Sequence, residues 1–231
     1  MAAVCTWIDG AIADASGSTL ATAAFANTAG RLLAVHIRYE STTTTTSVAD
    51  TAGNTYTGLT QNTAAGAPFG RWFYSIGTAA HAANVITVTW GAARTFKSMR
   101  IFEFAYDSCT FDVEAQGTTD SATSIATASF DTAGIGLILI GATNYNSDTG
   151  VTSITSANKY LMLQRQAATS GNLCNEGFGM TTGALSGATV TYAGSATTAR
   201  TIEIVSFLTG SLPPATGGGG LRLAGHGGLA A

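Results

Sequence analysis

The amino-acid sequence contains one pattern twice, about a hundred residues apart. Residues 19–25 read TLATAAF and are followed by the turn sequence NTAG and by the apolar run of 32–37. Residues 124–130 read SIATASF and are followed by DTAG and by the apolar run of 135–140. A repeat of this length predicts two copies of one structural unit, each with its own core or with half of a shared core.

The similarity returns further along each copy. The sequence VITVTW at 85–90 is matched by ATVTY at 188–192, and an Arg-x-x-Glu sequence follows each of them. The spacing is 105 residues between Phe25 and Phe130, 102 between Trp90 and Tyr192, and 100 between Glu103 and Glu203. The spacing drifts only by the size of small loops, which indicates a repeat along most of each copy.

Side-chain alternation tests this alignment, because successive residues of a strand point to opposite faces of the sheet. Aligning the two Arg-x-x-Glu sequences places a pair of large apolar residues of each copy toward a core: Phe102 with Phe104, and Ile202 with Ile204. The same alignment predicts that Glu103 and Glu203 point outward, with Arg100 and Arg200 on the opposite face. We therefore expect repeated scaffolding with an exposed charged face, and no pair of catalytic carboxylates.

Runs rich in Thr, Val, Ile and aromatic residues recur about every ten residues, and no stretch has a helical period with caps. Strands are expected in the first copy near 19–25, 31–39, 55–60, 70–76, 85–90 and 98–105. Strands are expected in the second copy near 124–130, 135–143, 159–166, 174–181, 188–192 and 200–208. We predict an all-β fold of two tandem homologous β-sandwiches of jelly-roll or immunoglobulin-like type, either as two bodies or merged into one large sandwich.

The pattern divides the chain into an N-terminal extension at 1–17, sandwich repeats at 18–110 and 111–210, and a Gly-rich C-terminal arm at 211–231. In the extension, Trp7 and Ile8 are expected to form either an extra edge strand or a contact with another chain. The polar run of 42–46 is expected to be an exposed strand or loop.

The C-terminal arm is rich in glycine, and such a segment behaves as a flexible coil in isolation. We predict that it binds a neighbouring subunit or partner through five side chains: Leu221, Arg222, Leu223, His226 and Leu229. The alternative is that the arm folds back on its own sandwich.

The composition argues against several function classes. Only 10% of the residues are charged and the net charge is −3, so no basic surface is expected for a nucleic-acid backbone. No apolar run approaches the roughly 20 residues needed to span a bilayer. The N-terminal sequence lacks the features of a secretory signal, which predicts synthesis in a cytoplasm. The three widely spaced cysteines are expected to be reduced: Cys5, Cys109 and Cys174.

The sequence contains no recognised motif for catalysis or metal binding. His36, His81 and His226 lack the spacing of a zinc site, and His36 is expected to be a satisfied core histidine. There is no Gly-x-Ser-x-Gly elbow and no phosphate-binding loop. The Asn/Asp sequence of 144–148 is expected to be a turn rather than a calcium loop, because Thr155 stands where an acid is required. We predict no catalytic residue, no metal and no cofactor.

Four segments together resemble a broad set of duplicated β-sandwich proteins encoded in tailed-bacteriophage and bacterial genomes. They are TAAF with GRLLAV at 22–35, DTAGNTY at 50–56, RWFY at 71–74 and VITVTW at 85–90. The resemblance covers about residues 18–210 and implies a virion structural or surface-exposed module. Its motifs are those of strands and turns, so it implies no catalytic residue.

The first functional expectation is therefore a non-enzymatic virion protein made in the host cytoplasm, most simply a capsid decoration or head-surface protein, with a tail or fibre component next. Its expected partners are other virion proteins, such as the major capsid or tail protein, and copies of itself. The alternative is a sandwich-type carbohydrate-binding module, in which Trp72, Tyr74 or Tyr145 would stack on sugar rings.

Overall fold

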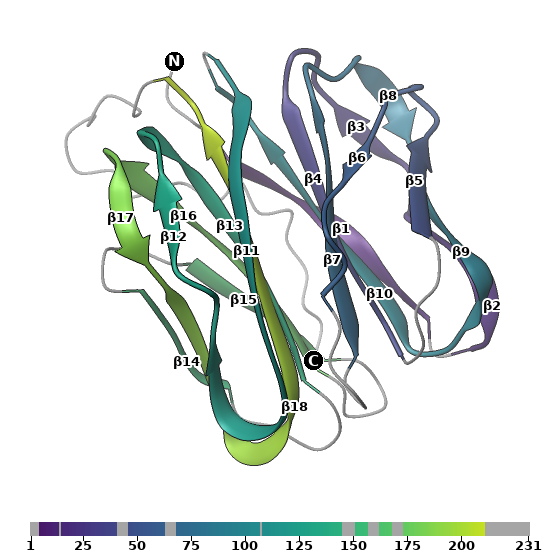
Figure 1. Ribbon diagram of the computed structural model, residues 1–231. Coiled ribbons are helices and arrows are strands. Elements are labelled where there is room, and N and C mark those ends of the chain that lie inside the picture. The colour runs from purple at the N-terminus through teal and green to yellow at the C-terminus, as the bar shows by residue number, and fades with distance from the viewer. Residues whose placement is uncertain are drawn as a thin grey trace.

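The computed structural model describes residues 5–13, 15–40, 46–62, 68–106, 108–144, 151–156, 162–167 and 173–210. Over these ranges every regular element is a β-strand, which confirms the all-β prediction (Figure 1). In this part of the chain no helix is long and apolar enough to cross a membrane.

The first half of the molecule comprises the strands up to residue 104. They are β1 (Cys5–Ala13), β2 (Gly17–Ala21), β3 (Phe25–Asn27), β4 (Leu32–Tyr39), β5 (Thr46–Asp50), β6 (Thr57–Gly58), β7 (Phe69–Ile76), β8 (His81–Asn84), β9 (Ile86–Arg94) and β10 (Lys97–Phe104). A five-stranded antiparallel sheet has the order β1-β10-β4-β7-β6. The sheet β2-β9-β5 and the pair β3-β8 accompany it.

The second half comprises the strands from residue 110 onward. They are β11 (Thr110–Ala126), β12 (Phe130–Thr132), β13 (Ile135–Asn144), β14 (Val151–Ser156), β15 (Met162–Ala167), β16 (Leu173–Thr182), β17 (Leu185–Ala188) and β18 (Val190–Leu208). The main sheet has the order β11-β18-β13-β16-β15, with β14 paired to the first residues of β18. The strands β12 and β17 form a separate pair.

The two main sheets have matching strand orders. Counted along each half, β1, β10, β4, β7 and β6 take the places that β11, β18, β13, β16 and β15 take in the other sheet. Each of the long strands β11 and β18 takes the place of two strands of the first half. The pairing between them has breaks in register where the two strands bend. Figure 1 shows the two halves side by side, with β4, β7 and β10 on one side and β13, β16 and β18 on the other.

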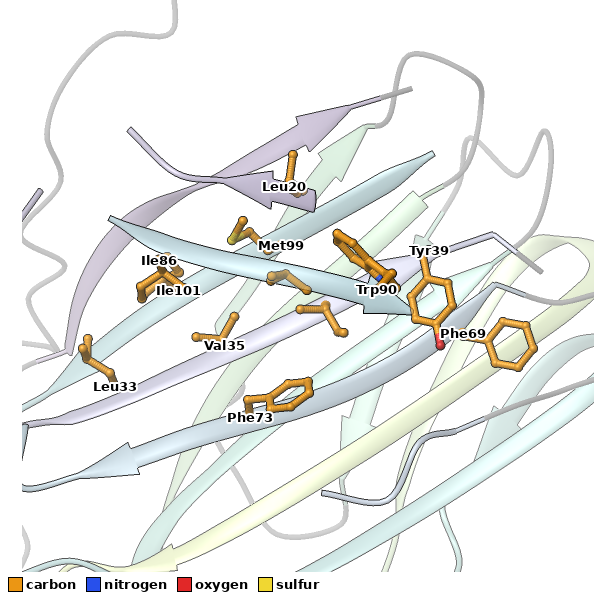
Figure 2. Close-up of a cluster of buried hydrophobic side chains, with 12 residues drawn as sticks. Leu20, Leu33, Val35, Tyr39, Phe69, Phe73, Ile86, Trp90, Met99 and Ile101 are labelled. Carbon is orange, nitrogen blue, oxygen red and sulfur yellow. The ribbon is translucent and has the colours of Figure 1, made fainter. Parts of the chain in front are cut away.

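Buried apolar side chains form three clusters, one inside each half and one between the halves. The first core lies within the first half (Figure 2) and contains Leu20, Leu33, Val35, Ile37, Tyr39, Phe69, Phe73, Ile86, Val88, Trp90, Met99 and Ile101. The central core joins the main sheets and contains Leu32, Ala34, Leu59, Trp72, Phe102, Phe104, Leu137, Leu139, Phe178, Val205 and Phe207. The second core lies within the second half and contains Ala115, Phe130, Ile138, Ile140, Ala142, Ala188, Val190, Tyr192, Ile202 and Ile204.

This layering explains the continuous apolar run of 32–37. Leu33 and Val35 on β4 face the first core, whereas Leu32 and Ala34 face the central core. All eight residues of β4 are buried. A strand that is covered on both faces has no solvent side, so its sequence does not alternate between apolar and polar residues.

Two aromatic contacts across the central core have nearly the same geometry. Phe104 and Phe178 meet edge to face with ring centroids 5.5 Å apart, and Tyr74 and Phe207 do so at 5.0 Å. Phe104 and Phe207 lie near the ends of β10 and β18, and Tyr74 and Phe178 lie on β7 and β16. The two main sheets therefore meet through faces that carry similar pairs of aromatic residues on strands at matching places in the two sheet orders.

The prediction that Glu103 and Glu203 point outward is wrong. Their side chains are 6% and 2% exposed. Glu203 shares its strand face with Val205 and Phe207 of the central core, whereas Glu103 accepts a hydrogen bond from the backbone N of Thr28, on the other side of its sheet. The two glutamates thus occupy opposite faces of their sheets and are not equivalent.

The error comes from the alignment of the two Arg-x-x-Glu sequences. Phe102 pairs with Ala34, Val205 pairs with Leu139, and all four face the central core, so Val205 matches Phe102 better than Ile202, which faces the second core. The sequence alignment was displaced by three residues along the strand. Because side chains alternate with a period of two, an odd displacement exchanges the faces. The predicted core residues Phe102, Phe104, Ile202 and Ile204 are all buried, but the first two lie in the central core and the last two in the second core.

A buried cation marks the corner before the last main-sheet strand of the first half. Lys97 Nζ donates to the backbone oxygens of Ala15, Gly17 and Arg94 at 2.9–3.0 Å and lies 6.0 Å from the ring centroid of Trp90. Three charge-assisted hydrogen bonds satisfy the whole ammonium group.

The second half has an arginine at the corresponding place. Arg200 Nε donates to the backbone oxygen of Ala122 at 2.9 Å, its Nη2 donates to that of Ala196, and its guanidinium lies 5.2 Å from the ring centroid of Tyr192. The counterpart of Arg200 is therefore Lys97 rather than Arg100.

The N-terminal extension contributes a strand to the main sheet. β1 pairs with β10 over its length, with a break in register between Ile8 and Ala11. Of the two expectations for Trp7 and Ile8, the edge strand is thus confirmed. In the polar run of 42–46, only Thr46 belongs to the described residues, and it begins β5. The predicted C-terminal arm at 211–231 lies outside the described residues.

Candidate functional site

A histidine between two glutamates lies in the middle of the interface between the main sheets. His36 is on β4, Glu176 on β16 and Glu203 on β18. His36 Nδ1 lies 3.0 Å from Glu176 Oε1, and His36 Nε2 lies 2.6 Å from Glu203 Oε1. The three residues are 1–2% exposed. They form a polar cluster that joins the first half to the second.

Glycines on the facing strands make room for this cluster. In the second half, Glu176, Gly141 and Glu203 lie side by side in register across β16, β13 and β18. A Cβ atom added to Gly141 would lie 2.3 Å from His36 Nε2, and one added to Gly70 would lie 1.8 Å from Glu203 Oε1. Any larger residue at these two positions would displace the polar side chains.

Asn62 holds the second oxygen of Glu203. Its Nδ2 donates to Glu203 Oε2 at 2.9 Å and also lies 2.9 Å from the backbone oxygen of Ile202 and 3.0 Å from that of Gly117. Backbone hydrogen bonds in both directions fix Asn62 opposite Gly70. Both carboxylate oxygens of Glu203 are therefore hydrogen-bonded, whereas Glu176 Oε2 has no hydrogen-bond partner within the described part of the chain.

The charge of His36 follows from two opposing effects. Burial lowers its pKa, but the hydrogen bonds to Glu176 and Glu203 and the charges of both carboxylates raise it to about 9. His36 is thus an imidazolium at neutral pH, and both ring nitrogens donate. The indole of Trp72 packs beside it, with ring centroids 4.8 Å apart.

A carboxylate–imidazole pair is found in many active sites, but this one is closed. Each ring nitrogen of His36 is already occupied by a carboxylate, and none of the three side chains is more than 2% exposed. A general acid or base must come within hydrogen-bond distance of its substrate, directly or through one water. The geometry instead suits a structural role, in which buried charges hold two surfaces in one register.

The sequence predicts one member of the cluster, His36, but not its contacts with the two glutamates. His36 is a buried, hydrogen-bonded histidine, as expected. Glu203 was assigned to an outer face, and Glu176 was not singled out. The available signal was that Glu176 lies two and four residues before Phe178 and Met180, on one strand face, in a chain with few charges.

A second polar cluster occupies the DTAGNTY segment that carried part of the resemblance. The Asp50 carboxylate accepts hydrogen bonds from the backbone N and Nδ2 of Asn54, from the hydroxyl of Tyr56 and from Nδ2 of Asn84, at 2.7–3.0 Å. Partial burial raises the pKa of Asp50, but these donors outweigh it and hold the pKa below its usual value. All the contacts are internal, so this cluster fixes the turn after β5.

The remaining predicted residues divide into those that are placed and those that lie outside the described residues. Trp72 is 1% exposed and cannot stack on a sugar. Tyr74 is partly buried and stacks on Phe111, with ring centroids 5.8 Å apart. Cys109 is a free thiol, and burial raises its pKa to about 12. The positions outside the described residues are Tyr145, Asn146, Asp148, Leu221, Arg222, Leu223, His226 and Leu229.

Over the described residues, no group of three or more His, Cys, Asp or Glu side chains could hold a metal ion. Comparison with protein-family models, with curated proteins and with solved structures gives no significant match.

Proposed function

We propose that this chain is a non-enzymatic structural protein of a bacteriophage particle, which decorates the head surface, with a position on the tail or a fibre as the second placement. The observation that carries the structural, non-enzymatic part of the proposal is the closed His36–Glu176–Glu203 cluster, and the placement on a particle comes from the sequence resemblance. The group of side chains best suited to chemistry is used to join two sheets and is inaccessible to a substrate.

The proposal includes a tandem duplication of one β-sandwich, with β1 to β10 as the first copy and β11 to β18 as the second. The first copy then begins at β1 and not at residue 18, because β1 takes the place that β11 takes in the second main sheet. The matching strand orders, the paired contacts of Phe104 and Tyr74 with the opposite sheet, and the corner cations Lys97 and Arg200 support it. The central core favours the merged arrangement over two separate bodies, because the main sheets bury large aromatic side chains against each other.

We further propose that the protein binds other virion proteins and copies of itself through its sandwich surfaces and its C-terminal arm. The arm residues assigned to this contact are Leu221, Arg222, Leu223, His226 and Leu229. A chain with 10% charged residues presents a surface rich in Thr, Ser, Ala and Gly, which can approach a neighbour with little desolvation of charge. On a particle, many weak contacts of this kind act together.

The test is sedimentation of the protein with particles from infected cells. We expect the full chain to sediment with particles, and a chain lacking residues 213–231 to remain folded but to show reduced occupancy. A control in which His81, a described and partly exposed histidine, is replaced by Gln should bind normally. Recovery of the full chain only in the soluble fraction would contradict the virion placement, and unchanged occupancy after truncation would contradict the role of the arm.

The carbohydrate-binding alternative keeps one described aromatic residue, Tyr74, because Trp72 is buried. The carbohydrate-binding function would be favoured over the virion proposal if the wild-type chain binds a glycan on an array, Tyr74→Ala does not, and the chain does not sediment with particles.

A further inference from the structure

Each half of the molecule has its own core, and the central core is a third, separate layer. Only residues 105–109 connect β10 to β11, so the halves are held together mainly by the faces of their main sheets. Neither the first nor the second core contains a histidine. A change in the charge of His36 therefore acts on the layer between the halves and not on the interior of either half.

The strands around His36 supply both charged and uncharged residues. On its own strand, Arg38 lies two residues away on the same face, and on β10, Arg100 is in register with it. The strand β7 supplies Trp72, which is uncharged. The second half supplies Glu176 and Glu203, with Gly141 between them. Two carboxylates and three cations are thus gathered in the closed layer when His36 carries its proton.

We propose that the His36–Glu176–Glu203 cluster is a proton-dependent latch, which keeps the two halves closed while His36 is protonated and lets the central layer open at alkaline pH. The two ring N–H groups bridge two carboxylates from the opposite half. When the proton leaves, one ring nitrogen presents a lone pair to a carboxylate oxygen, and that carboxylate keeps its charge without its donor. A buried carboxylate that has lost its partner strongly favours exposure to water.

The pH range follows from the sign of the shift. Since closure raises the pKa of His36 from 6.5 to about 9, the latch stabilises the closed form fully below about pH 6.5 and loses this effect as the pH rises through about 9. The closed-to-open ratio should fall by as much as about 300-fold over this interval, which is the ratio of the two proton dissociation constants.

Adjacent residues of β4 allow opening of the central layer to be separated from unfolding. Ala34 and Val35 are both 0% exposed, but Ala34 faces the central core and Val35 the first core. A cysteine at either position reacts with a thiol reagent only when its layer opens. The full chain would carry A34C or V35C with Cys5, Cys109 and Cys174 replaced by Ser, and its labelling rate would be divided by that of an unstructured peptide thiol at the same pH.

We expect protection of the A34C thiol to fall up to about 300-fold between pH 6.5 and 9.5 while V35C stays protected. Adding His36→Gln should remove the pH dependence of A34C, whereas adding His81→Gln should leave it unchanged. Equal loss of protection at both positions would mean global unfolding and would overturn the latch, as would constant protection at A34C. If His36→Gln does not fold, NMR titration of the His36 ring nitrogens in the wild-type chain decides, and a pKa at or below 6.5 overturns the proposal.

Discussion

Nε2 of His36 and Oε1 of Glu203 lie 2.6 Å apart although 167 positions separate the two residues in the chain. The contact crosses from the main sheet of the first half to that of the second. It is possible because glycines face both side chains, Gly141 opposite the imidazole and Gly70 opposite the carboxylate. Each of these two charged side chains is therefore accommodated by a glycine of the opposite half of the molecule.

Glu203 should contribute more to stability than Glu176. Both oxygens of Glu203 are hydrogen-bonded, whereas Glu176 uses one, so Glu203→Gln places an amide donor against the N–H groups of His36 or Asn62. We expect Glu203→Gln to lower the free energy of unfolding at pH 7 by roughly 3 kcal/mol and Glu176→Gln by roughly half of that. Urea denaturation measures both.

The matched control for these variants is Glu114→Gln. Glu114 also accepts two hydrogen bonds, from the backbone N and hydroxyl of Thr60, but these bonds lie at the surface. Its replacement should cost less than about 1 kcal/mol. Equal losses in Glu203→Gln and Glu114→Gln would show that burial of the cluster adds nothing.

Replacing Gly141 with Ala should disrupt the cluster sterically. The added Cβ would overlap His36 Nε2, and the imidazole cannot shift without breaking its hydrogen bonds, Nδ1 to Glu176 and Nε2 to Glu203. We expect a loss of about 2–3 kcal/mol in the free energy of unfolding. Gly183→Ala is the control, because a Cβ there meets no atom within 4 Å.

A double-mutant cycle separates this clash from a backbone effect of alanine. Because His36→Ala removes the atoms that overlap the new Cβ, the double variant should lose less stability than the two single variants added together. Strict additivity would mean that Gly141 is required for another reason.

The sequence repeat predicts the layers better than it predicts the site. The offset of 102 residues relates residues in similar surroundings: Trp90 and Val88 lie in the first core, and Tyr192 and Val190 lie in the second. The offset of 100 residues between Glu103 and Glu203 is wrong. Two charged residues three apart are a short pattern that recurs by chance, whereas an apolar alternation over six residues is fixed by the pleat of the strand.

The partners of His36 could not be predicted, because no local rule connects them. Glu176 and Glu203 are 140 and 167 residues away, and they meet His36 only when the two main sheets face each other. The sequence does predict that His36 is buried, since it lies inside an apolar run. What a buried polar residue bonds to depends on the packing of layers, which strand patterns leave open.

Asp50 should make the first half sensitive to acid. Its pKa is lowered because hydrogen bonds from Asn84, Asn54 and Tyr56 outweigh the effect of burial. A group with a lowered pKa stabilises the folded state above its ordinary pKa of 3.8, and this contribution is lost as the pH falls through the folded value. Asp50→Asn should cost roughly 2 kcal/mol at pH 7, and this cost should begin to fall as the pH drops below 3.8.

The measurement for Asp50 is urea unfolding of both proteins at several pH values between 3 and 7. The exposed Asp120 provides a control, because Asp120→Asn should leave the acid dependence as it is in the wild-type chain. A constant difference between Asp50→Asn and the wild type across this range would contradict the assignment of the acid-sensitive group.

Either a lysine or an arginine should serve at the corners of Lys97 and Arg200, but loss of the cation should lower the free energy of unfolding. Each donates to backbone oxygens at the corner before its main-sheet strand, and each lies over an aromatic ring. Lys97→Met keeps much of the side-chain volume but leaves three carbonyl groups without their donor, so we expect a loss of about 2–3 kcal/mol in the free energy of unfolding. Lys97→Arg should retain most of the stability, because a guanidinium can make the same contacts, as Arg200 does in the second half.

Urea denaturation of the two variants beside Arg200→Met measures these effects. If Lys97→Arg were as unstable as Lys97→Met, the corner would require an ammonium specifically, and the correspondence between the two corners would be limited to their position in the fold.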